Sequence, residues 1–229
     1  NFEKKTVDIN LKDKKSRIVI TGNESIIKNW TINLNAEEFL KEKNNLIDLQ
    51  TNLTGCLTFL DTKVENIDIY SKNLFCEDSV NFIRTSGTIN KMEIYDSLSD
   101  GLDMDFSNLN VNKLKVFNSQ NDCVDFSYGT YLIKEIEVKN CGDKALSVGE
   151  KSIVKINELN ASYSNFGAVS KDSSETIIND AKISYVKYCL GAYNKKSEFN
   201  GATLIVKKID CNNYHEKLYK DDLSEIIIK

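Results

Sequence analysis

Aspartates recur at a fixed spacing in the middle of the sequence. The interval from Asp100 to Asp122 is the same as that from Asp103 to Asp125, and Asp105 lies beside them. If the fold brings these positions together, the carboxylates repel one another unless a cation screens them, a lysine pairs with them or some remain protonated. Such groups transfer protons in catalysis or bind metal ions. We therefore take Asp100 and Asp122 as candidate acid–base residues. The other three, Asp103, Asp105 and Asp125, are candidate substrate contacts and Ca²⁺ ligands.

Two lysines continue this spacing towards the C-terminus. Lys144 follows Asp122 by the same interval, and Lys171 follows Ser127 by two such intervals. A lysine among carboxylates could be a simple counter-charge, or it could neutralise an acidic substrate or stabilise charge during a reaction. We count both lysines among the candidate catalytic residues. Neighbouring polar and aromatic side chains complete the candidate substrate-binding set, which comprises Glu150, Asp172, Tyr193, Lys195 and Lys196.

The elements that carry these residues follow the same period. Stepping by 22 from Asp78, the sequence reads DSVNFIR, DGLDMDF, DCVDFSY, KALSVGE, FGAVSKD and YCLGAYN. Within the rows apolar residues alternate with polar or small ones, so that Met104 and Phe106 point to one side and the aspartates to the other. This alternation predicts one short, half-buried β-strand in each repeat. Met104 should then lie between Phe82 and Phe126 of the adjacent repeats.

A second strand shares the period, because Met92, Leu114 and Ile136 are spaced by the same interval. Short strands that recur in this way, with Asn, Asp, Ser and Gly at the turns, indicate a solenoid. The Leu-x-x-Leu-x-Leu pattern of leucine-rich repeats is missing. We predict an all-β, single-domain, right-handed parallel β-helix over residues 1–229, with regular coils from about 46 to 211. Each coil should stack on the previous one at about 4.8 Å.

The first 45 residues fit the period less well. They contain two looser coils, followed by an acidic turn after Asn35 that predicts a short helix from about 36 to 44. Such a helix could cover an open end of the β-helix, where strand edges would otherwise be unpaired, or it could be an inserted surface helix. Because the sequence begins without Met, it could be a fragment of a longer protein.

In a parallel β-helix, positions one period apart line up as columns on the surface. The outward positions of the first strand predict one column of Asn81, Asp103, Asp125 and Ser147, and a second of Ile83, Asp105, Ser127, Gly149, Lys171 and Tyr193. A third column, where this strand begins, holds Asp78, Asp100, Asp122 and Lys144. The candidate carboxylates and both lysines are therefore expected on one outer face.

Composition and cysteine spacing restrict the alternatives. The net charge of −4 and the apolar content of 41% describe an ordinary folded domain and give no basis for nucleic-acid binding. No apolar run is long enough to span a membrane, and no signal peptide is recognisable. Six cysteines could form three disulfides, but Cys123 and Cys189 occupy the same position three coils apart, too far to bond to each other. We therefore expect buried free thiols and a cytoplasmic location, with the cell surface as the alternative.

Four of the rows resemble a known family. SDGLDMDF, NDCVDF, GDKALSVGE and GAVSKD are similar in order and spacing to the motifs Asn-Thr-Asp-Gly, Asp-Asp-Cys, Gly-His-Gly-Leu-Ser-Ile-Gly and Arg-Ile-Lys of polygalacturonase-like glycoside hydrolases, which have the β-helix of the pectin-lyase-like superfamily. The resemblance implies that Asp100 and Asp122 match catalytic aspartates, Lys144 the histidine and Lys171 the final lysine. Asn121 stands where the family has its general acid, and an amide cannot donate a titrating proton.

As a whole, the chain more closely resembles β-helix domains of bacterial cell-surface and polysaccharide-related proteins, including those joined to spore-coat-type kinase domains. The runs that carry this resemblance are Gly142 to Glu150, Lys171 to Ser174 and Ala192 to Lys196. It implies a link to glycans or to the cell envelope, with other domains of the same polypeptide as partners. It names no reaction.

Three functions fit these residues. The first, which the sequence favours, is a carbohydrate-directed module that binds an acidic or phosphorylated glycan of a capsule or other surface polysaccharide. The second is a hydrolase, lyase or epimerase acting on such a glycan, with Asp100 or Asp122 as the base and Lys144 or Lys171 neutralising a uronate. The third is a structural spacer. No cofactor is expected apart from the Ca²⁺ suggested above, and the identity of the glycan stays open.

Overall fold

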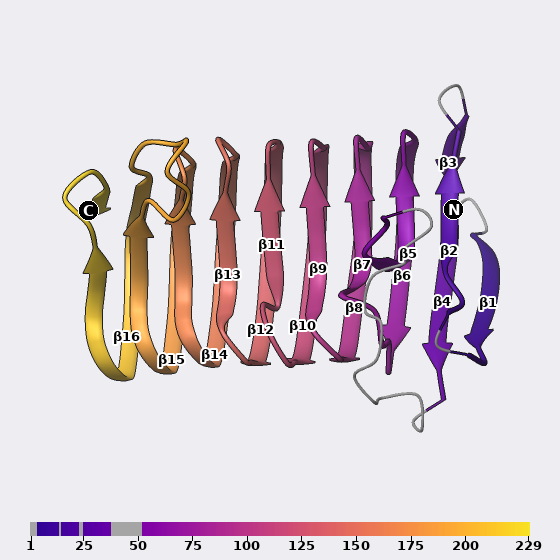
Figure 1. The fold of residues 1–229 in the computed structure, drawn as a ribbon, viewed down its shortest axis with the longest axis horizontal. Helices are drawn as coiled ribbons and strands as arrows, with labels where there is room; N and C mark the ends of the chain where they lie inside the picture. Colours follow the sequence, from indigo (N-terminus) through magenta and orange to yellow (C-terminus); the bar gives the residue numbers. More distant parts are fainter. Residues whose placement is uncertain (1–3, 14, 23–24, 38–51) are drawn as a thin grey trace.

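The protein is a single parallel β-solenoid. A computed structural model describes residues 4–13, 15–22, 25–37 and 52–229, which form about nine turns of roughly 22 residues (Figure 1). Short strands rise on the near side of Figure 1 and longer strands return behind them as the chain advances from its N-terminus, so the coil is right-handed. The predicted right-handed parallel β-helix is confirmed.

Seventeen strands and no helix make up the described residues. The strands are β1 (Lys5–Leu11), β2 (Ile18–Thr21), β3 (Ile26–Lys28), β4 (Trp30–Ala36), β5 (Gly55–Leu60), β6 (Lys63–Lys72), β7 (Asp78–Ile83), β8 (Ser86–Ser97), β9 (Asp100–Asp105), β10 (Asn108–Ser119), β11 (Val124–Ser127), β12 (Thr130–Cys141), β13 (Lys144–Gly149), β14 (Ile153–Lys171), β15 (Glu175–Tyr193), β16 (Thr203–Lys220) and β17 (Glu225–Ile228). The helix expected from about 36 to 44 falls almost entirely on residues 38–51, which lie outside the described part of the chain. Among the described residues, none belongs to a helix that could cross a bilayer.

Strands one coil apart pair in parallel and in register. Met104 of β9 pairs with Phe82 of β7 on one side and with Phe126 of β11 on the other, and all three side chains are fully buried. The longer strands stack in the same way, with Leu114 of β10 between Met92 and Ile136. The register predicted from the repeat is therefore confirmed for both strands, and the alternating apolar residues form one continuous core.

Coils bend where one or two residues adopt a left-handed backbone conformation. In the turn after the first strand, φ is positive at Asp61, Arg84, Phe106, Tyr128, Glu150 and Asp172. Asn, Asp and Gly tolerate this region best, whereas bulky side chains are strained in it. Phe106, with φ of 51° and 51% exposure, is thus a turn residue. The expectation that it points inward with Met104 was wrong, because the strand alternation stops one residue earlier.

Buried hydroxyl groups fix the corner beside the first strand. Ser107 Oγ accepts a hydrogen bond from Thr85 N at 2.9 Å and lies 2.8 Å from the carbonyl oxygen of Asp105, to which it donates. In the next coil Gly129 has no side chain, and the hydroxyl of Tyr131 takes this place, 2.7 Å from Met104 O. A Cβ atom on Gly129 would lie only 2.4 Å from that hydroxyl. The corner therefore holds the ends of β9 and β11, and with them the outward residues of these strands.

All six cysteines form disulfides, so the expectation of free thiols was wrong. Cys56 is bonded to Cys76, Cys123 to Cys141 and Cys189 to Cys211, with Cα–Cα distances of 5.3, 5.3 and 6.4 Å. Cys123 and Cys189 do share a column and are not bonded to each other. Each bonds instead to a cysteine about one coil later, 18 residues after Cys123 and 22 residues after Cys189.

The disulfides also correct the predicted location. Disulfides persist in oxidising environments and are rare in the cytosol. Three bonded pairs therefore point to an extracellular or cell-surface environment, and the expected cytoplasmic location was wrong.

The core register can be tested with two adjacent residues of β9. Met104→Asp would bury a charge without a partner, and we expect it to lower the free energy of unfolding by more than about 4 kcal/mol. Asp103→Asn is the matched control, because this half-buried side chain faces outward and neutralising it should not destabilise the fold. Urea denaturation of both variants measures the difference. Equal midpoints would mean that the inside and outside of β9 are assigned incorrectly.

Candidate functional site

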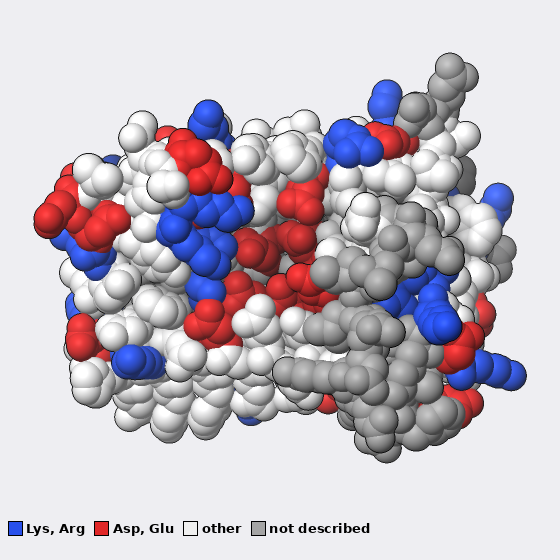
Figure 2. Space-filling view, in the orientation of Figure 1, with Lys and Arg blue, Asp and Glu red and all other residues white. Residues whose placement is uncertain are grey.

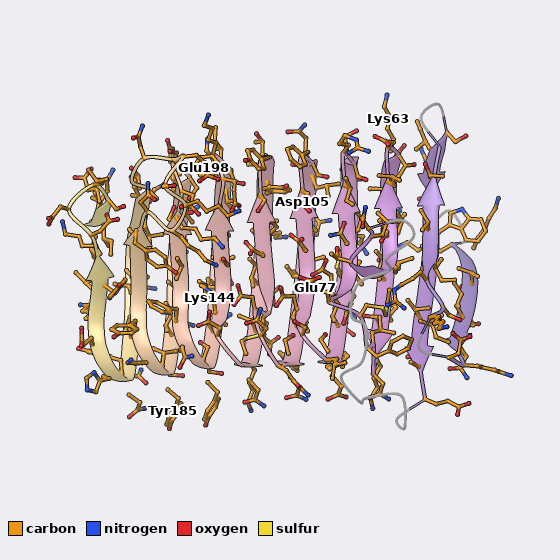
Figure 3. All side chains as sticks on the ribbon, in the orientation of Figure 1. Lys63, Glu77, Asp105, Lys144, Tyr185 and Glu198 are labelled. Carbon is orange, nitrogen blue, oxygen red and sulfur yellow. A yellow bond between two sulfur atoms is a disulfide. The ribbon has the colours of Figure 1, made fainter. Side chains whose placement is uncertain are left out.

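Most candidate residues lie on one face of the rod, which we call the first-strand face. It is the outward side of β5, β7, β9, β11, β13 and the ends of β14, β15 and β16. In Figure 2 acidic side chains gather in the middle of this face, with basic side chains beside them towards the C-terminus. Asp105 and Lys144 mark these two regions in Figure 3. We define the acidic patch as Asp78, Asp100, Asp103, Asp105, Asp122 and Asp125.

Strand pairing confirms the predicted columns. Asp78 pairs with Asp100, and Asn81, Asp103, Asp125 and Ser147 follow one another in register. The acidic patch therefore occupies three adjacent coils at the inter-strand spacing of about 4.8 Å. The fold positions these carboxylates by stacking and not by any local sequence motif.

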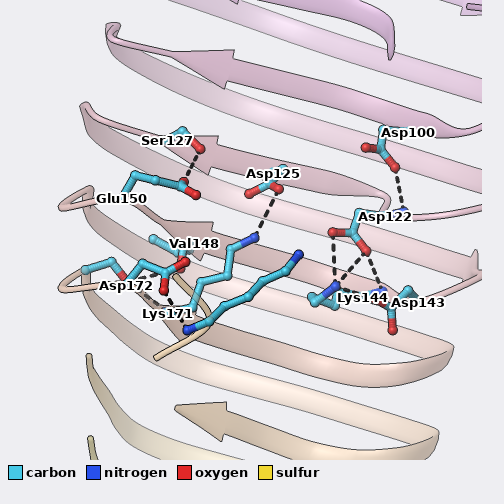
Figure 4. Close-up of polar contacts among 12 residues, drawn as sticks. Asp100, Asp122, Asp125, Ser127, Asp143, Lys144, Val148, Glu150, Lys171 and Asp172 are labelled. Atoms are coloured by element: carbon cyan, nitrogen blue, oxygen red, sulfur yellow. Dashed lines mark hydrogen bonds and ion pairs between the residues drawn. The ribbon is translucent and has the colours of Figure 1, made fainter. Parts of the chain in front are cut away.

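The column that starts the first strand forms a chain of hydrogen bonds (Figure 4). Asp122 N donates to Asp100 Oδ1 at 2.8 Å, and Lys144 N donates to Asp122 Oδ1 at 2.9 Å. Lys144 Nζ lies 3.4 Å from both oxygens of Asp122 and also donates to Asp143. Burial alone would lower the pKa of Lys144, but Asp122 and Asp143 raise it above its ordinary value. Lys144 is therefore a buried, charged and fully paired group.

Lys171 reaches back across two coils. Its Nζ atom lies 3.3 Å from Asp125 Oδ2, and the side chain is almost completely buried. Gly149 makes this path available, because a Cβ atom at that position would lie 2.7 Å from Lys171 Cε. Burial would lower the pKa of Lys171, but the charges of Asp125 and Glu150 raise it. The second lysine is thus also paired within the face.

Glu150 closes the face at the end of β13. Ser127 Oγ donates to its Oε2 at 2.5 Å, and Lys196 Nζ lies 2.6 Å from its Oε1. Burial alone would raise the pKa of Glu150, but the hydrogen bonds from Lys196 and Ser127 hold it below its ordinary value. Glu150 therefore carries a negative charge that is already neutralised.

The acidic patch has unusual protonation behaviour. Burial, together with the charge of Asp122, raises the pKa of Asp100 to about 7. Burial also raises the pKa of Asp78 to about 7, with a contribution from Asp100, and that of Asp125 to about 6 despite the opposing charge of Lys171. The pKa of Asp103 is raised well above its ordinary value by burial and by its acidic neighbours, Asp78 first. Burial likewise raises the pKa values of Asp105 and Asp122. Several of these carboxyl groups therefore change charge near neutral pH.

One outward column contains oxygen atoms that lack hydrogen-bond partners. Within the described part of the chain, Thr58 Oγ1, Asn81 Oδ1, Asp125 Oδ1 and Ser147 Oγ are buried and accept or donate no hydrogen bond. These residues and Asp103 are five successive members of a single column. Asn81 is 1% exposed, and its amide nitrogen donates to Asp78 and Asp103, so its free oxygen belongs to the acidic patch. Unsatisfied polar atoms are rare in folded proteins and mark sites of function or strain.

The remaining candidate residues differ in their contacts and in their exposure. Asp172 is buried, and its Oδ1 accepts hydrogen bonds from the backbone N of Lys195 and Lys196, at 2.6 and 2.8 Å. It thus anchors the connection between β15 and β16. Lys195 is exposed, and only Lys196 reaches the face, through Glu150. Tyr193 is half-buried, and burial raises its pKa.

Sequence reasoning missed two parts of the face. Asp143 pairs with Lys144 although the two are adjacent in sequence, a contact that periodicity cannot reveal. Aromatic side chains extend the face beyond the lysines, with ring centroids 4.7 to 6.2 Å apart, in a cluster of Phe166, Tyr188, Tyr193 and Tyr219. Phe166 and Tyr188 follow Lys144 at successive intervals of the repeat. The period of the sequence could therefore have predicted that these two aromatic residues lie side by side.

The geometry gives no support to a metal site. Among the described residues, no group of three or more acidic, histidine or cysteine side chains is arranged to hold a metal ion. Asp103, Asp105 and Asp125 lie on the same face, as neighbours on the paired strands β9 and β11.

Comparison with known proteins adds no relative. No protein-family model, no curated protein and no solved structure matches this chain. The likeness to the pectin-lyase-like superfamily therefore rests on the sequence motifs, while the structure shows the β-helix itself.

Proposed function

We propose that the first-strand face binds a glycan in an extracellular or cell-surface environment. The observation that carries this proposal is the acidic patch, in which Asp100, Asp103, Asp105 and Asp125 are only half-buried and lie on adjacent, paired coils. Carboxylate oxygens accept hydrogen bonds. A polyol chain laid along the rod offers hydroxyl donors at every sugar, which complements these carboxylates.

The charge of the first-strand face restricts the charge of the glycan that it can bind. Lys144 is paired with Asp122 and Asp143, Lys171 with Asp125, and Lys196 with Glu150. An acidic sugar would therefore meet a carboxylate-rich surface whose paired lysines offer no spare cation. We narrow the ligand from the acidic glycan expected from sequence to a neutral or amino-bearing glycan. An ammonium group would also relieve the repulsion within the acidic patch.

Aromatic side chains support the same ligand class. Phe166, Tyr188, Tyr193 and Tyr219 form a cluster on the same outward face, next to the lysines, and Tyr219 is 44% exposed. The rings provide apolar surface together with a polar hydroxyl group. A glycan that spans several coils could contact carboxylates at one end and aromatic rings at the other.

Binding can be measured by calorimetry with three hexasaccharides that differ in charge, namely a glucosamine oligomer, a neutral glucose oligomer and a galacturonate oligomer. We expect the glucosamine or glucose oligomer to bind. Asp103→Asn should weaken binding of the glucosamine oligomer about tenfold, because an ammonium group would stabilise the charged form of Asp103, which an amide cannot adopt. Asp96→Asn, an aspartate at another corner of the coil, is the matched control and should bind like the parent. Preferential binding of the galacturonate oligomer would contradict the assigned charge preference. Failure of all three to bind would refute the glycan assignment for these sugars.

A second candidate function is cleavage of the bound glycan. The observation in its favour is that Asp78 and Asp100 have pKa values of about 7 and Asp125 of about 6, the range in which a carboxyl group acts as an acid or a base at neutral pH. Release of reducing ends from a bound oligosaccharide, lost in Asp100→Asn but retained in Asp96→Asn, would establish this activity. Binding without release would leave the face a binding module.

A further inference from the structure

A groove lies on a different side of the rod, formed by the second strand segment of successive coils. Its volume is about 570 Å³, and its floor includes the aliphatic side chains of Leu132, Ile177 and Ile205. Leu132 is 46% exposed although it is a large apolar residue. The groove is lined by residues from β10, β12, β14, β15 and β16, so it runs along the rod axis across five coils. At about 4.8 Å per coil it is roughly 20 Å long, the length of about six extended residues.

Three lysines around this groove have no ionic partner. Lys134, Lys155 and Lys207 line it, and none of them forms an ion pair or side-chain hydrogen bond with a described residue. Lys113 and Lys208, on the neighbouring side of the rod, are paired with Glu135 and Asp180.

The placement of acidic residues explains this contrast. At the corner of the coil two successive residues point outward, and the second of them belongs to the neighbouring side, where Glu135 and Asp180 find their lysines. No acidic side chain lines the groove. Glu175 of β15 and Glu225 of β17 lie two residues before Ile177 and Ile227 and outside the groove lining. The groove therefore has a mostly apolar floor, in which Lys155 lies between Leu132 and Ile177, and Lys134 and Lys207 add positive charge along one edge.

We propose that this groove binds an extended acidic peptide that carries aliphatic side chains, from another protein or from another domain. The positive charges recur on three different coils, so they match several negative charges spread along a chain and not a single head group. The aliphatic floor favours peptide side chains over sugar rings. Asn157 and Asn179 stand at the edge, joined by a hydrogen bond of 3.1 Å that uses one polar group of each. The amide nitrogen of Asn157 and the amide oxygen of Asn179 are left to pair with the peptide backbone.

This site is independent of the glycan-binding proposal, because it shares no residue with the first-strand face. Charge attraction distributed along a groove sets specificity and the rate of association more than raw affinity. Binding should therefore weaken as the salt concentration rises, since exposed charges are screened within a Debye length of about 10 Å at 0.1 M.

The test is a binding titration with a synthetic decapeptide that alternates glutamate and leucine. We expect it to bind the parent protein, and the double variant Lys155→Glu/Lys207→Glu to bind it about tenfold or more weakly, because two attractions become repulsions. Lys217→Glu, an exposed lysine outside the groove, is the matched control and should bind like the parent. Leu132→Ser should weaken binding of the peptide without destabilising the protein, because this position is exposed.

Three comparisons distinguish this partner from the alternatives. A decapeptide alternating glutamate and serine should bind more weakly, because it lacks the aliphatic contacts, and one alternating lysine and leucine should not bind. Tighter binding of an oligogalacturonate at this groove would replace the peptide by an acidic glycan and overturn the proposal. Equal affinity of the glutamate–leucine peptide for the parent and the double variant would also overturn it.

Discussion

Reduction of the three disulfides is expected to unfold most of the protein molecules, or to leave the folded state only marginally stable. Each bond closes a loop of similar size, with sequence separations of 20, 18 and 22 residues. A loop of this length contributes about 3 kcal/mol through the lost freedom of the unfolded chain. Three such bonds give about 9 kcal/mol, which is comparable with the whole stability of a typical domain, roughly 5–15 kcal/mol. The loss should appear as a large fall in the urea midpoint when a reductant is present.

The same experiment can be resolved bond by bond. Double serine variants of each pair should each lose about 2–4 kcal/mol, while the remaining two bonds still form. Thiol labelling of the denatured, unreduced parent provides the control and should find no reactive cysteine. Labelling of six thiols under these conditions would contradict the disulfides, and with them the oxidising environment.

Neutralising Asp78 is expected to stabilise the protein at pH 8. The pKa of Asp78 is about 7 in the folded protein, because it is buried and lies near Asp100, against about 4 for an aspartate in an unfolded chain. The folded state therefore binds the proton of Asp78 more tightly, so the contribution of Asp78 to stability is fully present below about pH 4 and is lost as the pH rises through about 7. Asp78→Asn mimics the protonated form and keeps an oxygen for the hydrogen bond from Asn81 Nδ2.

The expected gain is about 2 kcal/mol at pH 8. This is less than the roughly 4 kcal/mol that corresponds to a rise of the pKa from about 4 to about 7, because Asp78 and Asp100 titrate together. At pH 4 the variant and the parent should be equally stable. Urea denaturation at both pH values measures the difference, with Asp96→Asn as the control that should change little at either. A variant less stable than the parent at pH 8 would show that the charge of Asp78 is compensated in the folded state.

The fold could be predicted because a β-helix converts sequence spacing directly into position. The period of the sequence placed Met104 between Phe82 and Phe126 and put the acidic columns on one face, and the structure confirms both. The period also aligned Cys123 with Cys189. It could not identify their partners, because the sequence separation of a bonded pair, 18 residues for Cys123 and 22 for Cys189, depends on the shape of each coil.

The contacts of the candidate site were harder to predict. Lys144 does lie over Asp122, as its column implies, whereas Lys171 reaches Asp125 two coils away because Gly149 leaves room for its side chain. The reach of a long side chain is not a property of spacing. Nor does the sequence show how strongly burial changes the pKa values of the acidic patch, since that depends on which neighbours cover each carboxyl group.

The disulfide between Cys189 and Cys211 bears on how the protein withstands proteolysis. The irregular connection between β15 and β16 carries two exposed lysines, Lys195 and Lys196, and lies within the loop that this disulfide closes. A trypsin-like enzyme that cut there would leave two pieces still joined through sulfur, with every parallel strand in place to hold them together. A cut between residues 142 and 188 falls inside no such loop. In a protease-rich extracellular medium, this exposed connection is thus one whose cleavage does not release a fragment.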